Sequence, residues 1–351
     1  MLEDRVAFNP SSTSRVLVRA TNWLGDAVMS LPAIREIRRV LPHAHLAVLA
    51  RPWVADLYAR ERAIDRVIPY PALKGLGARR AFAARLRAED FDTAILLQNA
   101  FDAALVAWLA AIPERIGYRR DGRGPLLTCA IAVPEPGDIP RHERFYYLEL
   151  LRRAGMIERL PADDAIRLDG IEAAREAGVA QLAALGVTGP VIGVSPGAAY
   201  GNAKRWLPER FAEAALRLGM ATLVFGSQAE RPLCEEVAGK IGNARNLAGE
   251  TTLRQFIDLA AVCTLFLTND SGAMHVASAL GVPTVTVFGA TDDTTTGPTG
   301  PLVRVVREHT ECSPCLLREC PIDHRCMTRV PASRVVAAAN ELLAWTHEPK
   351  S

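Results

Sequence analysis

The chain has 351 residues, of which 49% are hydrophobic and 23% charged, which is enough for two domains of ordinary size. Its 41 basic and 39 acidic residues give a net charge of +2, which argues against nucleic-acid binding through bulk electrostatics. The first residues contain no apolar stretch of signal-peptide length, and no run reaches the roughly 18 to 20 apolar residues of a membrane span. We therefore expect a cytoplasmic protein.

Short apolar runs alternate with helical patterns through the first half of the chain. This alternation predicts a parallel sheet covered by helices. Helical patterns then flank a break rich in Pro and Asp before residue 171. The expected strands are 16–20, 46–50 and 94–98, and the expected helices are 27–40, 78–88, 102–110, 143–154 and 171–185.

The same rhythm starts again in the second half, which predicts a second doubly wound α/β domain. Its expected strands are 191–197, 221–227, 265–270 and 284–291, with helices at 208–218, 230–240 and 272–280. We expect domains at 1–180 and 181–331, with the hinge between 160 and 190. A last helix within 332–351 is expected to return and pack on the first domain.

The first strand–turn–helix unit carries an acid where a dinucleotide-binding turn would carry a cluster of glycines. Its turn reads Asn22-Trp23-Leu24-Gly25-Asp26 and is a poor phosphate cradle. Asp26 has two readings. It is either a structural cap that favours the positive end of the helix, or a functional carboxylate at the carboxyl end of a strand, where ligands of such domains bind.

Four strand ends in the second half carry small residues, a cation or a helix start, which together predict a nucleotide-diphosphate site. Backbone N–H groups at 271–274 suit phosphate oxygens, and Asp270 is the natural N-cap of that helix. His275, one turn further, is more often a packed residue than a catalytic one. The four stretches are Ser195-Pro196-Gly197 with Lys204 on the following loop, Gly226-Ser227, Gly249-Glu250-Thr251-Thr252, and Asn269-Asp270-Ser271-Gly272.

Seven cysteines divide into two groups. Cys129, Cys234 and Cys263 stand in apolar surroundings and are expected to be reduced core residues. The other four lie in CSPCLLRECPIDHRCM, with His324 among them, and their ligand-like spacing makes a structural Zn²⁺ one interpretation. Free thiols or a disulfide are the alternatives. These four are Cys312, Cys315, Cys320 and Cys326.

These motifs together resemble those of the ADP-heptose:lipopolysaccharide heptosyltransferases of glycosyltransferase family 9, the type II enzymes most closely. The resemblance implies a glycosyltransferase-B fold of two facing Rossmann-like domains, with the donor held mainly by the second. It also implies an inverting, metal-independent transfer from ADP-L-glycero-β-D-manno-heptose to a heptose of the lipopolysaccharide inner core. The matching stretches, from about residue 15 to 290, are NWLGDAVMSLPA, SPGAAYGNAKRWLPERFAEAA, FGSQAE, RNLAGETTL and TNDSGAMHVASALGVPTVTVFG.

The resemblance also implies roles for single residues. Asp26 becomes the general base for the attacking hydroxyl, with Gly25 beside it on the acceptor side. Glu230 or Gln228 is expected at the ribose, and Thr251 or Thr252 at the adenine. The donor-binding set is Ser195, Lys204, Glu230, Thr251, Thr252, Asp270, Ser271, Gly272, Ala273 and His275.

The implied acceptor, Kdo-lipid A carrying a heptose, is anionic and calls for basic side chains on the first domain. Arg119, Arg120 and Arg123 are candidates, as is the basic helical pattern at 74–88. A solvated basic face is the alternative for each arginine. A basic amphipathic helix would also suit peripheral contact with the anionic inner leaflet of the inner membrane. A monomer is the default expectation.

Three other functions stay open at this point. One is heptosyltransferase I or another inner-core glycosyltransferase, because donor motifs say little about which hydroxyl attacks. Another is a two-domain sugar-nucleotide epimerase, in which acids and His275 would perform the proton chemistry. The last is a non-catalytic module that binds an ADP-sugar.

Overall fold

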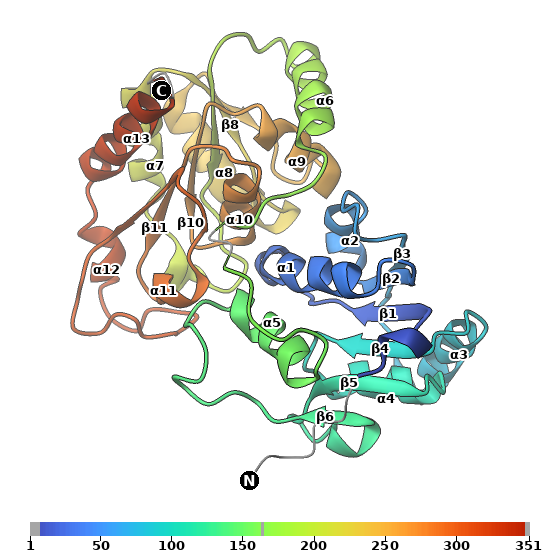
Figure 1. The fold of residues 1–351 in the computed structure, drawn as a ribbon. Coiled ribbons are helices and arrows are strands. Elements are labelled where there is room, and N and C mark those ends of the chain that lie inside the picture. The colour runs from blue at the N-terminus through green and yellow to red at the C-terminus, as the bar shows by residue number, and fades with distance from the viewer. Residues whose placement is uncertain (1–7, 163–164, 348–351) are drawn as a thin grey trace. The chain divides into compact units, whose positions relative to one another are not determined.

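The computed structural model describes residues 8–162 and 165–347, and the chain divides into two compact units at 163/164. The expected boundary near 180 is wrong because helix α6 (Ile171–Ala184) packs on α9 (Leu253–Ala261) of the second unit. Gly178 permits this close approach, since a Cβ there would lie 2.1 Å from the carbonyl oxygen of Asp258. The boundary therefore precedes α6 (Figure 1).

The first unit is a six-stranded parallel sheet in the order β3-β2-β1-β4-β5-β6. This is the classic doubly wound order, which reverses between β1 and β4. The strands are β1 (Arg15–Arg19), β2 (His45–Ala50), β3 (Arg66–Pro69), β4 (Thr93–Leu96), β5 (Glu114–Tyr118) and β6 (Cys129–Ile131). The helices are α1 (Leu24–Val40), α2 (Pro52–Tyr58), α3 (Gly75–Arg87), α4 (Phe101–Leu109) and α5 (Arg144–Arg153).

The second unit repeats this topology, with strand order β12-β11-β10-β7-β8-β9 and a reversal between β7 and β10. Its strands are β7 (Val191–Ser195), β8 (Ala221–Val224), β9 (Arg245–Asn246), β10 (Leu265–Asn269), β11 (Thr284–Phe288) and β12 (Val303–Arg307). Besides α6 and α9, its helices are α7 (Pro208–Leu218), α8 (Arg231–Ile241), α10 (Gly272–Ala279), α11 (Asp293–Thr296), α12 (Arg325–Thr328) and α13 (Ala332–His347). The predicted fold class is confirmed.

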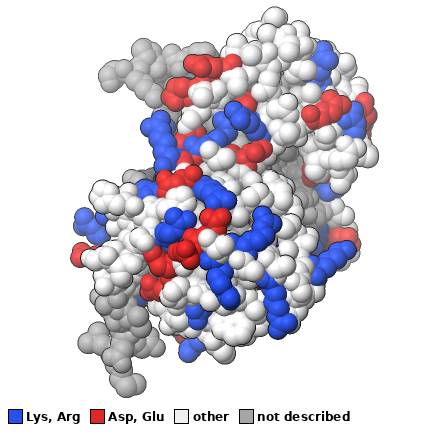
Figure 2. Space-filling view, turned by 90° about the vertical axis from the view of Figure 1, so that its right-hand side faces the viewer, with Lys and Arg blue, Asp and Glu red and all other residues white. Residues whose placement is uncertain are grey.

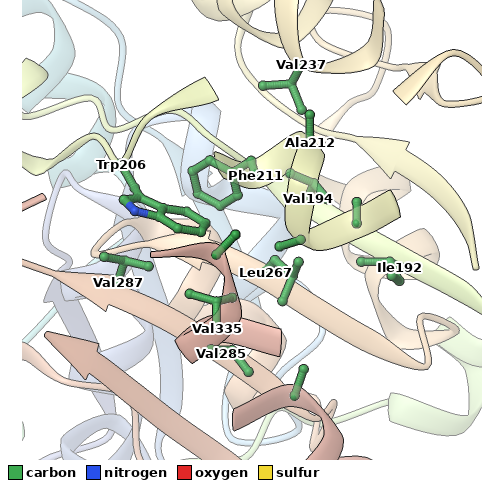
Figure 3. Close-up of a cluster of buried hydrophobic side chains, with 14 of the residues drawn as sticks. Ile192, Val194, Trp206, Phe211, Ala212, Val237, Leu267, Val285, Val287 and Val335 are labelled. Carbon is green, nitrogen blue, oxygen red and sulfur yellow. The ribbon is translucent and has the colours of Figure 1, made fainter. Parts of the chain in front are cut away.

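Strand alternation builds the cores. In β1, Leu17 packs with side chains of α3 and α4 on one face of the sheet, while Val16 and Val18, equally buried, point to the other. In the second unit, valine and leucine side chains of the strands pack against α7, α8 and α13 (Figure 3). Trp206 is the largest buried side chain of this core. Burial on both faces explains why these strands are nearly all apolar.

Helix α13 belongs to the second unit. Val335, Ala339 and Leu342 are buried in the same core as Val285 and Val287 of β11, and α13 also contacts α7 and β12. The expectation that this helix packs on the first domain is therefore wrong. The apolar face of α13 packs on the face of its own sheet, at β11 and β12.

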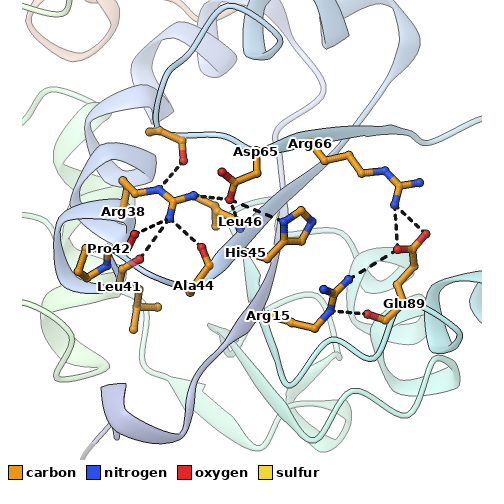
Figure 4. Close-up of polar contacts among 11 residues, drawn as sticks. Arg15, Arg38, Leu41, Pro42, Ala44, His45, Leu46, Asp65, Arg66 and Glu89 are labelled. Carbon is orange, nitrogen blue, oxygen red and sulfur yellow. Dashed lines mark hydrogen bonds and ion pairs between the residues drawn. The ribbon is translucent and has the colours of Figure 1, made fainter.

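Charged side chains fix the amino-terminal edge of the first sheet (Figure 4). Arg38 of α1 donates to the Asp65 carboxylate and the Ala63 carbonyl, which precede β3, and to the carbonyl of Ala44, which leads into β2. Glu89 accepts from Arg66, and its backbone carbonyl accepts from Arg15. Because ligands of this fold bind at the opposite, carboxyl edge, we assign these contacts to structure.

No helix in the described ranges 8–162 and 165–347 is both long enough and apolar enough to cross a membrane. On the face drawn in Figure 2, Lys and Arg side chains alternate with Asp and Glu and do not form one continuous basic field.

Candidate active site

The carboxyl ends of β7 and β10, where the strand order of the second sheet reverses, form the centre of the donor half of the candidate site. Asn269 at the end of β10 is fully buried and joins the two strand ends. Its amide donates to the carbonyl of Pro196 at 2.7 Å, and its Oδ1 accepts from the backbone N–H of Trp206 at 2.9 Å. This side chain therefore fixes both ends of the loop that carries Lys204.

Lys204 and Asp270 form a tight ion pair at this point. The Lys204 Nζ lies 2.6 Å from Asp270 Oδ2, and both side chains are largely buried. The same carboxylate oxygen accepts from the hydroxyl of Thr291, which follows β11. The structure thus brings together two residues that are 66 positions apart in the sequence and holds the ammonium beside the start of α10.

The start of α10 differs from the expectation in one detail. The N-cap is Ser271 and not Asp270, whose carboxylate is bound to Lys204 and Thr291. The Ser271 hydroxyl lies 3.1 Å from that of Thr268. The first backbone N–H groups of a helix have no intrahelical partner, so those from Gly272 and Ala273 onward suit an anion. His275 is buried in this helix.

Two further strand ends of the sheet lie on the other side of β7. Glu230 accepts from the backbone N–H and the hydroxyl of Ser227, which follows β8. Its carboxylate lies so close to Gly197 that a Cβ at that position would be 2.1 Å from Glu230 Oε1. The absence of a side chain at Gly197 therefore lets Glu230 reach the end of β7, beside Ser195. Gln228 lies in the same way against Gly249, which has a φ of +75°.

Thr252 is the N-cap of α9. Its hydroxyl accepts from the backbone N–H of Gln255 at 3.2 Å, and the Gln255 side chain accepts from Thr252 in return. This reciprocal capping box gives the Thr252 side chain a structural role. A contact of Thr251 or Thr252 with adenine stays a prediction.

Asp26 is half-buried in the first turn of α1, directly after the carboxyl end of β1. Its neighbours are ionisable groups of other elements, namely Tyr58 at the end of α2 and Glu143 and Tyr147 at α5. α1 and α5 pack against each other. The turn follows β1, next to the point where the strand order of the first sheet reverses.

Glu143, at the N-cap of α5, was not found from the sequence. Burial, and after it the negative charge of Asp26, raise the pKa of Glu143 to about 7, while Arg120 opposes the rise. The Tyr147 pKa is also raised, first by burial and then by Asp26 and Glu143. Two carboxyl groups therefore share one partly desolvated environment. The only sequence signal was an acid at the start of a helix in RHERFYY.

We expect Glu143→Gln to stabilise the protein at alkaline pH. Stability linked to the protonated form of Glu143 is complete below about pH 4.5 and is lost as the pH rises through about 7. The pKa difference corresponds to about 3 kcal/mol at most. In urea unfolding the variant should exceed the wild type near pH 9, with a gain that vanishes toward about pH 5. Glu158→Gln, an exposed carboxylate of the same unit, is the matched control, and a gain that does not depend on pH would contradict the assignment.

The three candidate acceptor arginines behave differently. Arg119 and Arg120 are exposed after β5, and a hydrogen bond with Tyr146 raises the pKa of Arg120. Arg123 is fully buried and donates to the carbonyls of Tyr118 and Gln98 and to the side chain of Asn99. The expected acceptor role of Arg123 is wrong, because its guanidinium is buried and its donors bind groups inside the domain.

Of the interpretations that the spacing of the late cysteines left open, the structure favours free thiols. All seven cysteines are free thiols, and Cys129, Cys234 and Cys263 are buried as predicted. Cys312 is exposed, whereas Cys326 is buried against Gly289. Among the residues that the structure describes, no group of three or more His, Cys, Asp or Glu side chains is placed to hold a metal ion. A structural Zn²⁺ at Cys312, Cys315, Cys320 and Cys326 is therefore not supported.

Two doubly wound domains, each with polar residues at its switch point, are the architecture of glycosyltransferases with the B-type fold, the class that the family comparison then identifies. The family model "Glycosyltransferase family 9 (heptosyltransferase)" matches residues 79–325. The chain therefore belongs to glycosyltransferase family 9.

Relatives and solved structures agree with this assignment. The chain is 33% identical to lipopolysaccharide heptosyltransferase 2 of Salmonella typhimurium over 84% of this chain and 88% of that protein. The structure of ADP-heptose lps heptosyltransferase II from E. coli superposes with a TM-score of 0.82 at 30% identity, covering 95% of this chain and 100% of that one. A family 9 glycosyl transferase from Veillonella parvula, 22% identical, shows the same fold with a TM-score of 0.82, over 97% and 99% of the two chains.

Proposed function

We propose that this glycosyltransferase is a heptosyltransferase II, which transfers L-glycero-D-manno-heptose from ADP-heptose to a heptose of the lipopolysaccharide inner core. The observation that carries the proposal is the likeness to the E. coli heptosyltransferase II structure over 95% of this chain. The Salmonella relative is likewise named a lipopolysaccharide heptosyltransferase 2. We place the enzyme in the cytoplasm, with peripheral contact to the inner leaflet of the inner membrane.

Each unit supplies its own part of the chemistry. A sugar hydroxyl is a weak nucleophile, and Asp26 takes its proton as the bond to the anomeric carbon forms. The departing ADP gains negative charge on its β-phosphate. Lys204 and the first N–H groups of α10 stabilise that charge while the sugar becomes oxocarbenium-like. An anionic leaving group stabilised in this way needs no divalent metal in our proposal.

The donor-side residues follow from the geometry around β7 and β10. Asp270 and Thr291 hold Lys204 in place. Ser271, Gly272 and Ala273 offer backbone donors to the diphosphate, with His275 in the same helix. Glu230, which lies against Gly197 beside Ser195, is placed for the ribose hydroxyls. On the acceptor side we assign Gly25 beside the base, with Arg119 and Arg120 for the anionic groups of Kdo-lipid A.

The test is ADP release from the purified protein with ADP-L-glycero-β-D-manno-heptose, with EDTA present throughout. Two acceptors are compared, one carrying Kdo alone and one carrying Kdo and one heptose. We expect turnover only with the heptose-bearing acceptor, because the type II enzyme attacks through a heptose hydroxyl. Turnover on Kdo alone would make this a heptosyltransferase I, and loss of turnover in EDTA would contradict metal independence.

A further inference from the structure

The segment 310–326, which carries the late cysteines and which the proposed mechanism does not use, is fastened to the loop that carries Lys204. The backbone N–H of Ala203 donates to the carbonyl of Arg318 at 3.0 Å, and His324 Nε2 lies 3.0 Å from the carbonyl of Ala203. The Tyr200 hydroxyl donates to the carbonyl of Leu316 at 3.0 Å. The two loops therefore form one layer at the carboxyl edge of the second sheet.

Gly201 makes this close contact possible. A Cβ at that position would lie 2.1 Å from the carbonyl oxygen of Arg318, closer than any real contact. The segment is also bound on its other side, since Leu316 donates to the carbonyl of Ala290 after β11. Arg318 is thus held at its backbone, while its side chain is exposed.

The Tyr200 ring carries two cations. Lys204 Nζ lies 4.9 Å from the ring centroid and Arg318 Cζ lies 5.1 Å from the same centroid. The two charges are therefore no more than about 10 Å apart, about one Debye length in 0.1 M salt. Cation–π attraction supports each charge singly but does not remove the repulsion between them.

The countercharge at this place is incomplete. Asp270 pairs with Lys204, but no carboxylate forms an ion pair with Arg318 within the part of the chain that the structure describes. Asp270 also directly precedes the start of α10, whose dipole adds positive potential. One Lys, one Arg and a helix start against one Asp leave an excess of positive charge, which an anionic ligand would complete.

We propose that Arg318 is a second side-chain ligand of the donor diphosphate, acting with Lys204 and positioned by Tyr200. This inference rests on the proposed function, because it assigns a further residue to the same donor site. A planar guanidinium presents a rigid fork of N–H donors that matches two phosphate oxygens, whereas a lysine ammonium is a point charge without that fixed geometry. The segment 310–326 then has a role in substrate binding without any metal.

The experiment measures binding of ADP by titration calorimetry, without acceptor, to wild type, Arg318→Ala, Arg318→Lys and Lys204→Ala. We expect Arg318→Ala to raise the Kd for ADP about tenfold, the size of one lost charge-assisted hydrogen bond at an exposed site. The Arg318→Lys variant should recover only part of the affinity, because the ammonium keeps the charge but lacks the planar fork of donors. The affinity of Arg318→Ala should also depend less on salt than that of the wild type, because one charge contact is gone.

Arg329→Ala is the matched control, an exposed arginine just beyond the same segment at the end of α12, and its ADP affinity should equal that of wild type. Wild-type affinity and salt dependence in Arg318→Ala, together with weakened binding in Lys204→Ala, would overturn the role of Arg318 and leave the proposed function intact. Absence of ADP binding by the wild type would overturn both.

Discussion

Asp26→Asn should lower the turnover number by at least about a hundredfold and leave the affinity for ADP near that of the wild type. The amide has the shape of the carboxylate but cannot take the proton of the attacking hydroxyl. Asp26 lies in the first turn of α1 in the first unit, whereas the strand ends that we assign to the diphosphate belong to the second unit. The measurement is steady-state ADP release with the heptose-bearing acceptor, combined with calorimetric titration of ADP.

The alternative role of Asp26 is a purely electrostatic one at the start of a helix. Glu172→Gln removes an exposed acid from the first turn of α6 and controls for this role, since it should leave turnover unchanged. A helix-dipole interaction contributes about 0.3–1 kcal/mol to stability. Its loss would lower the melting temperature without a selective loss of turnover. If Asp26→Asn lost stability and ADP binding in parallel with activity, Asp26 would be a cap and not a base.

Trp206→Ala should destabilise the second unit by about 3–5 kcal/mol, the range for truncating a large buried aromatic side chain. The indole is 1% exposed, packs edge-on against Phe211 with ring centroids 4.9 Å apart, and donates to the carbonyl of Val330 at 3.0 Å. Truncation leaves a cavity between the strands and α13, together with an unpaired carbonyl. Urea unfolding followed by far-UV circular dichroism measures the loss.

Two variants separate the causes of that loss. Trp206→Phe keeps most of the apolar volume and removes the N–H, so it should cost less than the alanine variant. Trp108→Ala truncates a half-exposed tryptophan of the first unit and should have a small effect. Trp206 lies two residues beyond Lys204, and its backbone N–H donates to Asn269. The alanine variant keeps this donor, so any loss of ADP affinity should come from a shift of the backbone around the cavity. An unfolding transition equal to that of wild type would show that the core repacks around the gap.

Most of the fold could be predicted from the sequence because the inner strands are buried on both faces. Runs such as Val16-Leu17-Val18 and Leu265–Asn269 have few polar residues, and each lies within two residues of its expected bounds. The missed strands are mixed in composition, such as β3 with RVIP and β12 with VRVVR. Both lie at a sheet edge, where one side of the strand meets solvent and the apolar run is interrupted.

The errors in domain boundary and helix placement have a different cause. An amphipathic helix shows in its sequence that it has an apolar face, but not which surface will cover that face. Both α6 and α13 were assigned correctly as helices, yet their partners, α9 and the β11–β12 face, are set by the tertiary fold. The Gly178 contact that fixes α6 involves a residue 80 positions away.

The parts of the candidate site that one continuous motif forms could be predicted from the sequence. The parts that depend on contacts between distant segments could not. The α10 start and the turn of Asp26 are single motifs, and the structure places them at strand ends as expected. Arg123 looked like its neighbours Arg119 and Arg120, but its burial depends on carbonyls of Gln98 and Tyr118. Glu143 and Arg318 likewise became candidates only through neighbours that are distant in the sequence, Asp26 and Tyr200 respectively.

The placement of α13 on its own sheet has a consequence for the topology of the whole chain. Since the last helix stays with the second unit, the backbone passes between the two units a single time, at 163/164. Each unit is therefore a continuous piece of sequence with its own complete six-stranded sheet. A gene cut at this one point would encode each six-stranded unit separately, and under the proposed function recombination between family members would exchange the donor-binding and acceptor-binding units as intact modules.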